Sequence, residues 1–435
     1  MKRRAVRSRG FTLVELMVSL VMGLIIALAA VALARTATTT FYEQARISGV
    51  EATVRAASER LRSDLSRASY MSTPNIQLDP RIARIPGAVG QPYRIPALAD
   101  LQGIRILPAN ASVRGHAYTL RNGLSPHELH IAGNLTTDDV YRGQFMVDAG
   151  GGCGTIVRLS GQADPAVRRL FNGAADAAER QAMTEVAFMP GLRMSPPVAG
   201  VLYAVQVMDM RGCFHYLTVC GVAQDPTQPE SVLLSLQGDG GNGILTTEAT
   251  LGDVCGARVM EEVAIAPIQR VRWHLGVENE PRRLDPVLEG TGADKFNLYR
   301  QVLDASGVTP VGAPEVIAEH AVDMKFGLFV DSSVPSAPPT SVNANFESDD
   351  ALFATWAGPV GAASLPNIGP QRIRSVRYRL AFRTPFPDRR ADLPTGAGPP
   401  YITRYCMGPD PCTDWARVRT VISEVALLNQ ARANY

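Results

Sequence analysis

The chain has 435 residues, of which 46% are hydrophobic and 19% are charged, a composition typical of a protein that folds around a core. This composition excludes a largely disordered chain, and the length allows one large domain or about two to three medium ones. The formal net charge of +2 gives no support to nucleic-acid binding, which we do not predict.

A basic leader precedes a long apolar run. Lys2, Arg3, Arg4, Arg7 and Arg9 place five positive charges and no negative charge before residue 11. The run from Phe11 to Ala34 has 24 residues. As a helix it would extend ~36 Å, enough to cross a ~30 Å hydrocarbon core. The positive-inside rule keeps the basic end cytoplasmic, so we expect the residues after Ala34 to lie outside the cytoplasm.

Glu15 is the one carboxylate in this apolar run. A carboxylate in a spanning segment costs at least ~2.5 kcal/mol and is tolerated mainly where something pairs with it. One interpretation is that Glu15 lies shallow enough to reach the lipid headgroups. The other requires a cut after Gly10, because Phe11 of a neighbouring subunit would then carry an amino group that pairs with this carboxylate.

The segment Gly10-Phe11-Thr12-Leu13-Val14-Glu15 resembles the cleavage and methylation motif of type IV prepilins and type II secretion pseudopilins. The resemblance implies that a prepilin peptidase cuts between Gly10 and Phe11 and methylates the new amino terminus of Phe11. It also implies that Glu15 guides docking into a growing filament. Removal of the leader's five positive charges would change the formal net charge from +2 to −3.

Two other interpretations of this segment remain. Ala32-Leu33-Ala34 resembles the small-residue site of a secretory signal, but the apolar run is longer than the usual 7 to 15 residues of such a signal. An unprocessed transmembrane anchor is the second alternative. It leaves the Gly10-Phe11 junction without a role.

A helical pattern continues beyond the apolar run. Apolar residues recur at spacings of three and four, which predicts one stripe of an amphipathic helix; they are Ile47, Val50, Val54, Ala57, Leu61, Leu65 and Ala68. Opposite this stripe we expect the surface pairs Glu51 with Arg55 and Arg60 with Asp64. No proline interrupts the chain from Phe11 to Pro74, so we predict one helix over residues 11–73 that packs on a following β-rich domain. A free coiled coil is the weaker alternative.

The segments that follow predict a β framework with a helical insertion. Prolines spaced through residues 74–110 indicate loops and short edge strands. Asp164-Pro165 predicts a helix N-cap before helices at 166–171 and 174–186. Val201 to Met208 and Cys213 to Val222 flank a turn and predict a hairpin.

Further strands are expected in other stretches rich in β-branched and aromatic residues. These are 113–120, 144–147, 231–236, 259–264, 270–276, 296–302, 321–330, 373–382 and 418–428, with long loops at 332–345 and 385–401. The predicted fold class is α+β, with a long N-terminal helix packed on a large antiparallel β-rich head. The predicted domains are a leader (1–10), a transmembrane and spine helix (11–73) and a globular head (74–435).

Looser similarities extend the resemblance into the second half of the chain. Four segments are similar to the C-terminal half of PilW-type minor pilins: Asn297 to Arg300, Val316 to Gly327, Ser375 to Leu380 and Val418 to Asn429. They favour a minor pilin over a pseudopilin. The chain is far longer than a major pilin, and residues 74–200 resemble no family known to us.

All six cysteines, Cys153, Cys213, Cys220, Cys255, Cys406 and Cys412, lie on the predicted exported side, where disulfides form readily. The turn-rich loop between Cys406 and Cys412 favours a bond between these two, and it resembles the C-terminal disulfide loop of many pilins. Cys213 and Cys220 lie an odd number of residues apart on one predicted strand, so each should pair elsewhere. Zinc binding is the alternative, but the chain has no C-x-x-C pair.

Catalytic motifs are nearly absent, and we predict no enzyme, cofactor or resident metal. His127-Glu128-Leu129-His130 is one residue shorter than the metalloprotease motif, and on a strand its histidines would not share one face as they do on a helix. The glycine-rich segment 238–243 fits a turn better than a phosphate loop. This segment or 347–350 is a weak calcium candidate without recognised ligand spacing. Trp273, Trp356 and Trp415 fit core or edge packing.

Together these features predict a minor pilin that is held in the inner membrane with its head in the periplasm and then assembled into a type IV pilus. The implied partners are the prepilin peptidase, the major pilin and other minor pilins, the inner-membrane assembly platform and membrane lipid. The alternatives are a type II secretion pseudopilin, or an adhesive or binding module that uses the helix only as an anchor.

Overall fold

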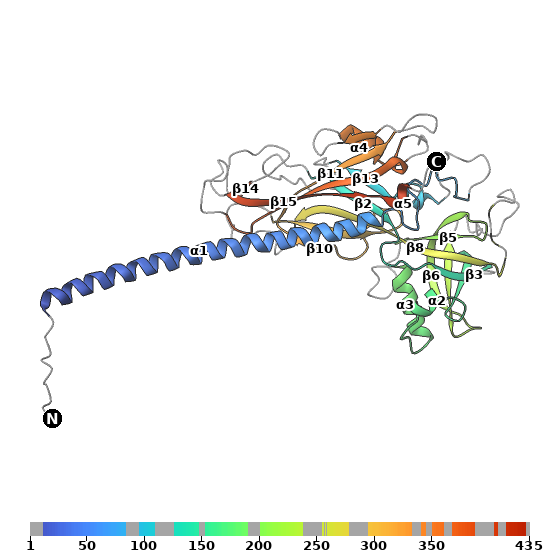
Figure 1. Cartoon of the computed structure of the whole chain (residues 1–435). Helices are drawn as coiled ribbons and strands as arrows, with labels where there is room; N and C mark the ends of the chain where they lie inside the picture. Colours follow the sequence, from blue (N-terminus) through green and yellow to red (C-terminus); the bar gives the residue numbers. More distant parts are fainter. Residues whose placement is uncertain are drawn as a thin grey trace, which may run out of the picture. The chain divides into compact units, whose positions relative to one another are not determined.

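The computed structural model describes residues 12–83, 95–108, 126–147, 153–189, 201–237, 255, 257, 259–277, 295–332, 341–344, 350–360, 368–387, 404–407 and 415–431. The chain divides into two compact units, residues 1–53 and residues 54–435. Helix α1 (Leu13–Ser66), the long helix in Figure 1, contributes residues to both units. The α+β class predicted from the sequence is confirmed, because this long helix precedes a head of antiparallel strands.

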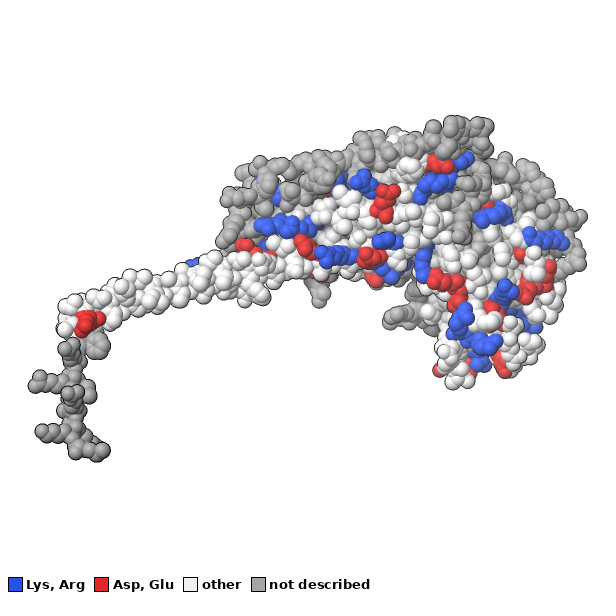
Figure 2. All heavy atoms as spheres, in the orientation of Figure 1, with Lys and Arg blue, Asp and Glu red and all other residues white. Residues whose placement is uncertain are grey.

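In the first unit, α1 is apolar and exposed. Its large side chains from Leu13 to Leu33 are more than half exposed, and the helix surface in Figure 2 is mostly uncharged. At the start of the helix, Thr12 and Glu15 exchange hydrogen bonds through their side chains. By length and composition, α1 is the one helix in the described part of the chain that could span a membrane. An exposed apolar surface of this kind requires lipid or other protein around it in order to be stable.

In the second unit, the end of α1 is a core element. The predicted stripe is buried at Val54, Ala57, Leu61 and Leu65, each at most 5% exposed. The helix ends at Ser66, earlier than the predicted end near Pro74. The reason is tertiary, since the Ser69 amide donates to the carbonyl of Ala132 at 2.9 Å and the next turn is pinned to the sheet.

Gly133 allows this close approach of the chain after α1. A Cβ atom at position 133 would lie 2.5 Å from the carbonyl oxygen of Arg67 and 3.2 Å from the amide nitrogen of Tyr70. Any larger residue would therefore push the helix end away from the strand. The Asn134 amide, one residue on, donates to the carbonyl of Tyr70 at 2.8 Å and completes the contact.

A first sheet runs through the long strand β8 (Glu262–Val277). The second half of β8 pairs antiparallel with β2 (Glu128–Gly133) and β9 (Phe296–Leu303), and β1 (Ile104–Leu107) and β10 (Glu315–Glu319) form the edges. The sequence predicted two separate strands here. Pro267 does not interrupt β8. On the edge of β8 that faces β3 and β2, the pairing with β3 ends at Ile265 and the pairing with β2 begins at Gln269. No strand therefore requires a hydrogen bond from residue 267 on that edge, and proline can occupy the position.

The first half of β8 also closes a ring of six strands. It pairs on one side with β3 (Tyr141–Val147) and on the other with β5 (Tyr203–Met208). The ring, hereafter the six-strand ring, continues through β4 (Gly154–Ser160), β7 (Ser231–Gln237) and β6 (Phe214–Gln224). Its interior is apolar, with Phe145, Val157, Leu217 and Ile265 fully buried.

Two helices accompany this ring, as the sequence predicted. Helix α2 (Pro165–Leu170) starts at Asp164, whose carboxylate accepts from the amides of Ala166 and Val167. Helix α3 (Ala177–Phe188) is capped in the same way by Asp176. The predicted hairpin is β5 with β6.

A second sheet has the order β12-β11-β13-β15-β14. Its strands are β11 (Ala321–Asp331), β12 (Ser341–Ala344), β13 (Ile373–Arg383), β14 (Arg404–Cys406) and β15 (Trp415–Ala426). Three short helices complete the described head, α4 (Asp350–Trp356), α5 (Leu428–Ala431) and the 3-10 helix η4 (Pro370–Arg372); a further 3-10 turn is η1 (Pro96–Leu98).

Several expectations are corrected or fall outside the described residues. Strand β12 lies inside the loop expected at 332–345, and β15 ends at Ala426 before α5 begins. The expected strand at 113–120 and the segments 238–243 and 347–349 lie outside the described residues. Trp273 and Trp356 are buried, and Trp415 packs under the guanidinium of Arg404 at 4.1 Å, which confirms packing roles.

Candidate functional site: the start and the anchored end of helix α1

The first described turn of α1 forms a reciprocal cap. The Glu15 carboxylate accepts from the amide and from the hydroxyl of Thr12, each at 3.0 Å, while the Glu15 amide donates to the Thr12 hydroxyl at 3.3 Å. This is the capping-box arrangement of a threonine and a glutamate three residues apart. It satisfies amides at a helix start that have no carbonyl partner. Gly10 and Phe11, the predicted processing residues, lie outside the described part.

The other end of the helix is anchored by a buried carboxylate. Asp64 is 3% exposed and accepts from the indole of Trp273 at 3.0 Å and from the Nε of Arg300 at 2.7 Å. The sequence had placed Asp64 on the helix surface, paired with Arg60. That prediction is wrong: Arg60 instead lies 3.9 Å from Glu315, and Asp64 points into the first sheet.

A second polar contact joins the same helix turns to the second sheet. The hydroxyls of Ser58 and Tyr378 lie 2.8 Å apart, and Tyr378 is fully buried. Because Trp273 and Arg300 lie on β8 and β9 whereas Tyr378 lies on β13, the end of α1 is fixed to both sheets at once. The sequence predicted that the apolar stripe of α1 would be buried, but it predicted none of these polar contacts.

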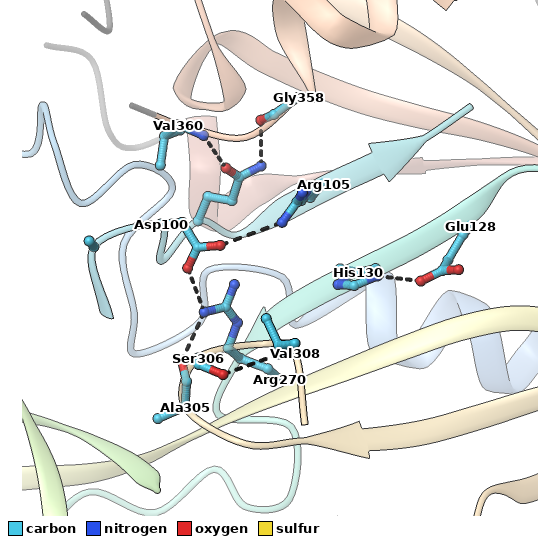
Figure 3. A network of polar contacts seen from close by, with 12 residues as sticks. Asp100, Arg105, Glu128, His130, Arg270, Ala305, Ser306, Val308, Gly358 and Val360 are labelled. Carbon is cyan, nitrogen blue, oxygen red and sulfur yellow. Dashed lines mark hydrogen bonds and ion pairs between the residues drawn. The ribbon is translucent and has the colours of Figure 1, made fainter. Parts of the chain in front are cut away.

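Polar groups also gather within the first sheet (Figure 3). Arg270 donates to the Asp100 carboxylate and to the Ala305 carbonyl, each at 2.9 Å, and His130 lies 2.6 Å from Glu128. Burial lowers the pKa of His130, although the Glu128 carboxylate opposes the shift. The side chain of Gln102 hydrogen-bonds Ile104 at the start of β1 as well as Gly358 and Val360, so it connects β1 to the segment after α4. These contacts act as structural cross-links.

The two histidines of the H-E-x-H segment take part in separate polar contacts. His127 lies just before β2, where its Nδ1 accepts from the amide of Phe326 at 3.2 Å and its Nε2 lies 3.3 Å from Lys325. Burial and the cations Lys325 and Arg379 lower the pKa of His127 to about 3. His127 therefore stays neutral at physiological pH and joins β2 to β11, while His130 pairs with Glu128.

Two disulfides, Cys153–Cys220 and Cys213–Cys255, join residues on or near the strands of the six-strand ring and are hereafter the ring disulfides. Cys213 and Cys220 pair with different partners, as the alternation of the strand predicted. Cys406 is also disulfide-bonded. Its predicted partner, Cys412, lies outside the described residues, so the pairing of these two stays a prediction.

One group of three possible metal ligands gathers in the described part of the chain, Asp209, Cys213 and Cys255. The two sulfurs form a disulfide and so are not thiolates. The Asp209 carboxylate accepts from the amides of Arg211 and Cys213 and lies 3.1 Å from the imidazole of His215. This group therefore holds the β5–β6 turn.

Comparison with known proteins finds a similarity at the N-terminal end of the chain. A family model described as the prokaryotic N-terminal methylation motif matches residues 6–31. No curated protein and no solved structure matches the chain. The motif, together with the long apolar helix that begins within it, supports a type IV pilin-like or pseudopilin protein, a class that is structural and is processed by a prepilin peptidase.

Proposed function

We propose that this chain is a minor pilin. It is cut between Gly10 and Phe11, methylated at Phe11 and held in the inner membrane by residues 11–34, with its head in the periplasm. From there it enters a type IV pilus in low copy, beside the major pilin and other minor pilins. The observation that carries the proposal is the methylation motif, matched over residues 6–31, at the start of an apolar helix whose side chains are exposed.

Glu15 is the residue proposed to direct assembly. Its carboxylate is held by Thr12 of its own chain, which keeps it at the helix start. A carboxylate has about four lone-pair sites, so it retains capacity for a second partner. The methylated amine of Phe11 in an adjacent subunit would supply that partner. Gly23, with no atom within 4 Å of an added Cβ, leaves room for close helix approach.

The head supports the minor-pilin assignment over the pseudopilin one. The segments similar to PilW-type minor pilins coincide with the strands that hold α1, since Arg300 on β9 binds Asp64 and Tyr378 on β13 binds Ser58. The six-strand ring adds bulk that would interrupt a regular shaft. A subunit of low copy, at the tip or in priming, fits such a head.

The test compares two carboxylates on the same helix. In a native host that lacks its own copy of the gene, Glu15→Ala should leave the protein in the inner membrane but remove it from sheared filaments. Glu43→Ala, which changes the next acidic residue along α1, should behave as the unchanged chain does. Wild-type amounts of the Glu15→Ala protein in filaments would overturn the proposal.

The same strains separate the pilus from the secretion system. Deletion of the gene should reduce surface pili while protein secretion through the type II system continues. Normal piliation with a block in secretion would favour the pseudopilin alternative. Normal piliation and secretion, with a loss of surface attachment, would favour the anchored binding module.

A further inference from the structure

A cavity of about 930 Å³ lies against the six-strand ring, far along the sequence from the helix. It is bounded by β3 and β4, by the start of α2 and by the residues that lead into β8. Its size is within the range of small-ligand sites, roughly 300–1,000 Å³. No step of filament assembly proposed above uses this part of the head.

The polar wall of the cavity contains three arginines, each in an ion pair. Arg142 lies 3.2 Å from Glu262, Arg169 binds Asp139, and Arg158 lies 2.6 Å from the buried Asp225. Because Arg142 and Gln144 alternate along β3 and Gln144 is directly opposite Arg158 on β4, these side chains share one face of the two strands. The cavity therefore presents guanidinium donors beside carboxylate and amide acceptors.

The charge of the wall decides which ligands it suits. Three arginines and four carboxylates line the cavity, so its formal charge is −1 and each lining arginine has a carboxylate partner. A phosphate or sulfate would compete with these carboxylates and be repelled by them. A neutral ligand with many hydroxyl groups would not, because every hydroxyl both donates and accepts.

An exposed methionine lies beside this polar wall. Met260 lines the cavity and is 53% exposed as a residue, and its backbone adopts φ 69°, a left-handed conformation that residues other than glycine seldom adopt. Its amide donates to the carbonyl of Phe145 at 2.8 Å, which fixes it to β3. Strained residues of this kind gather at ligand sites.

We propose that this cavity binds a neutral oligosaccharide. The hydroxyl groups contact Arg142, Gln144, Arg169 and Glu262, and the C–H face of a sugar ring packs on Met260. This inference goes beyond the proposed assembly function and rests on different residues, so either one can fail without the other.

The test is binding of a panel of neutral and anionic di- to tetrasaccharides to the full chain, by calorimetry or saturation-transfer NMR. The chain is kept in nanodiscs, because glycoside detergents would occupy a sugar site. We expect at least one neutral member to bind. Gln144→Ala and Arg169→Ala should each weaken that binding at least about tenfold, the loss of roughly one charge-assisted or well-placed hydrogen bond.

Arg168→Ala is the matched control, since Arg168 neighbours Arg169 on α2 but does not line the cavity. It should leave the affinity unchanged. Thermal unfolding of each variant shows whether the ring remains folded. The inference is overturned if no neutral saccharide binds, if only anionic members bind, or if folded Gln144→Ala and Arg169→Ala proteins bind as tightly as the control.

Discussion

Asp64 and Arg300 are 236 residues apart in the sequence, yet their side chains meet at 2.7 Å with both residues buried. Asp64 lies on the last turns of α1 and Arg300 on β9 of the first sheet. Moving either element by one residue would separate the charges, so this pair fixes the register of the helix end on the head. The proposed assembly into a filament requires such a fixed contact, because the head has to enter the filament together with its helix.

Replacing Asp64 should destabilise the head strongly. Among the described residues, Asp64→Leu leaves the buried Arg300 with the exposed Glu315 as its carboxylate neighbour, and the loss of one partner of a buried ion pair typically costs about 3–5 kcal/mol. Denaturant unfolding of the full chain in nanodiscs measures this cost. Glu59→Leu on the exposed face of the same helix is the control and should change stability by less than about 0.5 kcal/mol.

The double variant Asp64→Leu with Arg300→Met tests the cause of that loss. Removing both charges avoids an unpaired buried cation, so the double variant should be more stable than Asp64→Leu alone. Equal stability of the two would show that the ion pair is not the source of the loss.

His127 should make the head sensitive to acid. Its pKa is about 3 in the folded chain and 6.5 ordinarily, so between these values the unfolded chain binds a proton that the folded chain does not. Stability from this group is fully present above pH 6.5 and falls as the pH drops toward 3, by up to ~1.4 kcal/mol per pH unit. His127→Gln, which keeps an acceptor for the Phe326 amide, should flatten this decline in urea unfolding. Parallel declines in the two proteins would contradict the assignment.

The two ring disulfides should contribute similarly to stability. They connect residues 67 and 42 positions apart, a difference that changes loop-closure entropy only slightly. The double variants Cys153→Ser with Cys220→Ser and Cys213→Ser with Cys255→Ser should each lose about 2–5 kcal/mol in non-reducing denaturant unfolding. If either variant unfolds at the wild-type midpoint, that bond is not stabilising.

Substitutions of Thr12 distinguish the effect of helix capping from the effect of the charge of Glu15. Thr12→Ala removes the hydroxyl that exchanges hydrogen bonds with Glu15, while Thr12→Ser retains it. Loss of an N-cap costs about 0.5–2 kcal/mol, so hydrogen exchange at the first amides of α1 should accelerate in Thr12→Ala only. Filament entry should survive both changes, since the carboxylate remains. A loss of entry as complete as that of Glu15→Ala would assign the effect to the cap.

Sequence patterns predicted those helices, caps and turns that depend on residues close together in the chain. The helix, the cap at Asp164 and the β5–β6 hairpin follow from spacing, side-chain chemistry and turn residues. The cap at Asp176 was not predicted, because the second helix was expected to begin at residue 174. The long β8 did not follow, because Pro267 indicates a break unless its neighbours in the sheet are known. The closure of the six-strand ring depends on pairings between residues up to 124 positions apart, as between Tyr141 and Ile265, which no local pattern specifies.

The functional residues at the start of α1 could be predicted from the sequence, whereas those that anchor its end could not. The methylation motif is a contiguous signature. Asp64 was assigned to the helix surface because an arginine lies four residues before it, yet its true partners, Trp273 and Arg300, come from distant strands. A buried carboxylate on an amphipathic helix has no distinctive pattern in one sequence. Its position on the apolar side, next to Leu65 and Leu61, was the only available signal.

The most direct test of the central claim is the N-terminus of the membrane-extracted protein, determined by intact mass and N-terminal sequencing in the native host and in a strain without its prepilin peptidase. The proposal predicts a chain that begins with N-methylated Phe11 when the peptidase is present and retains Met1 or the leader when it is absent. A chain that begins beyond Ala34, or that keeps its leader in both strains, would contradict it.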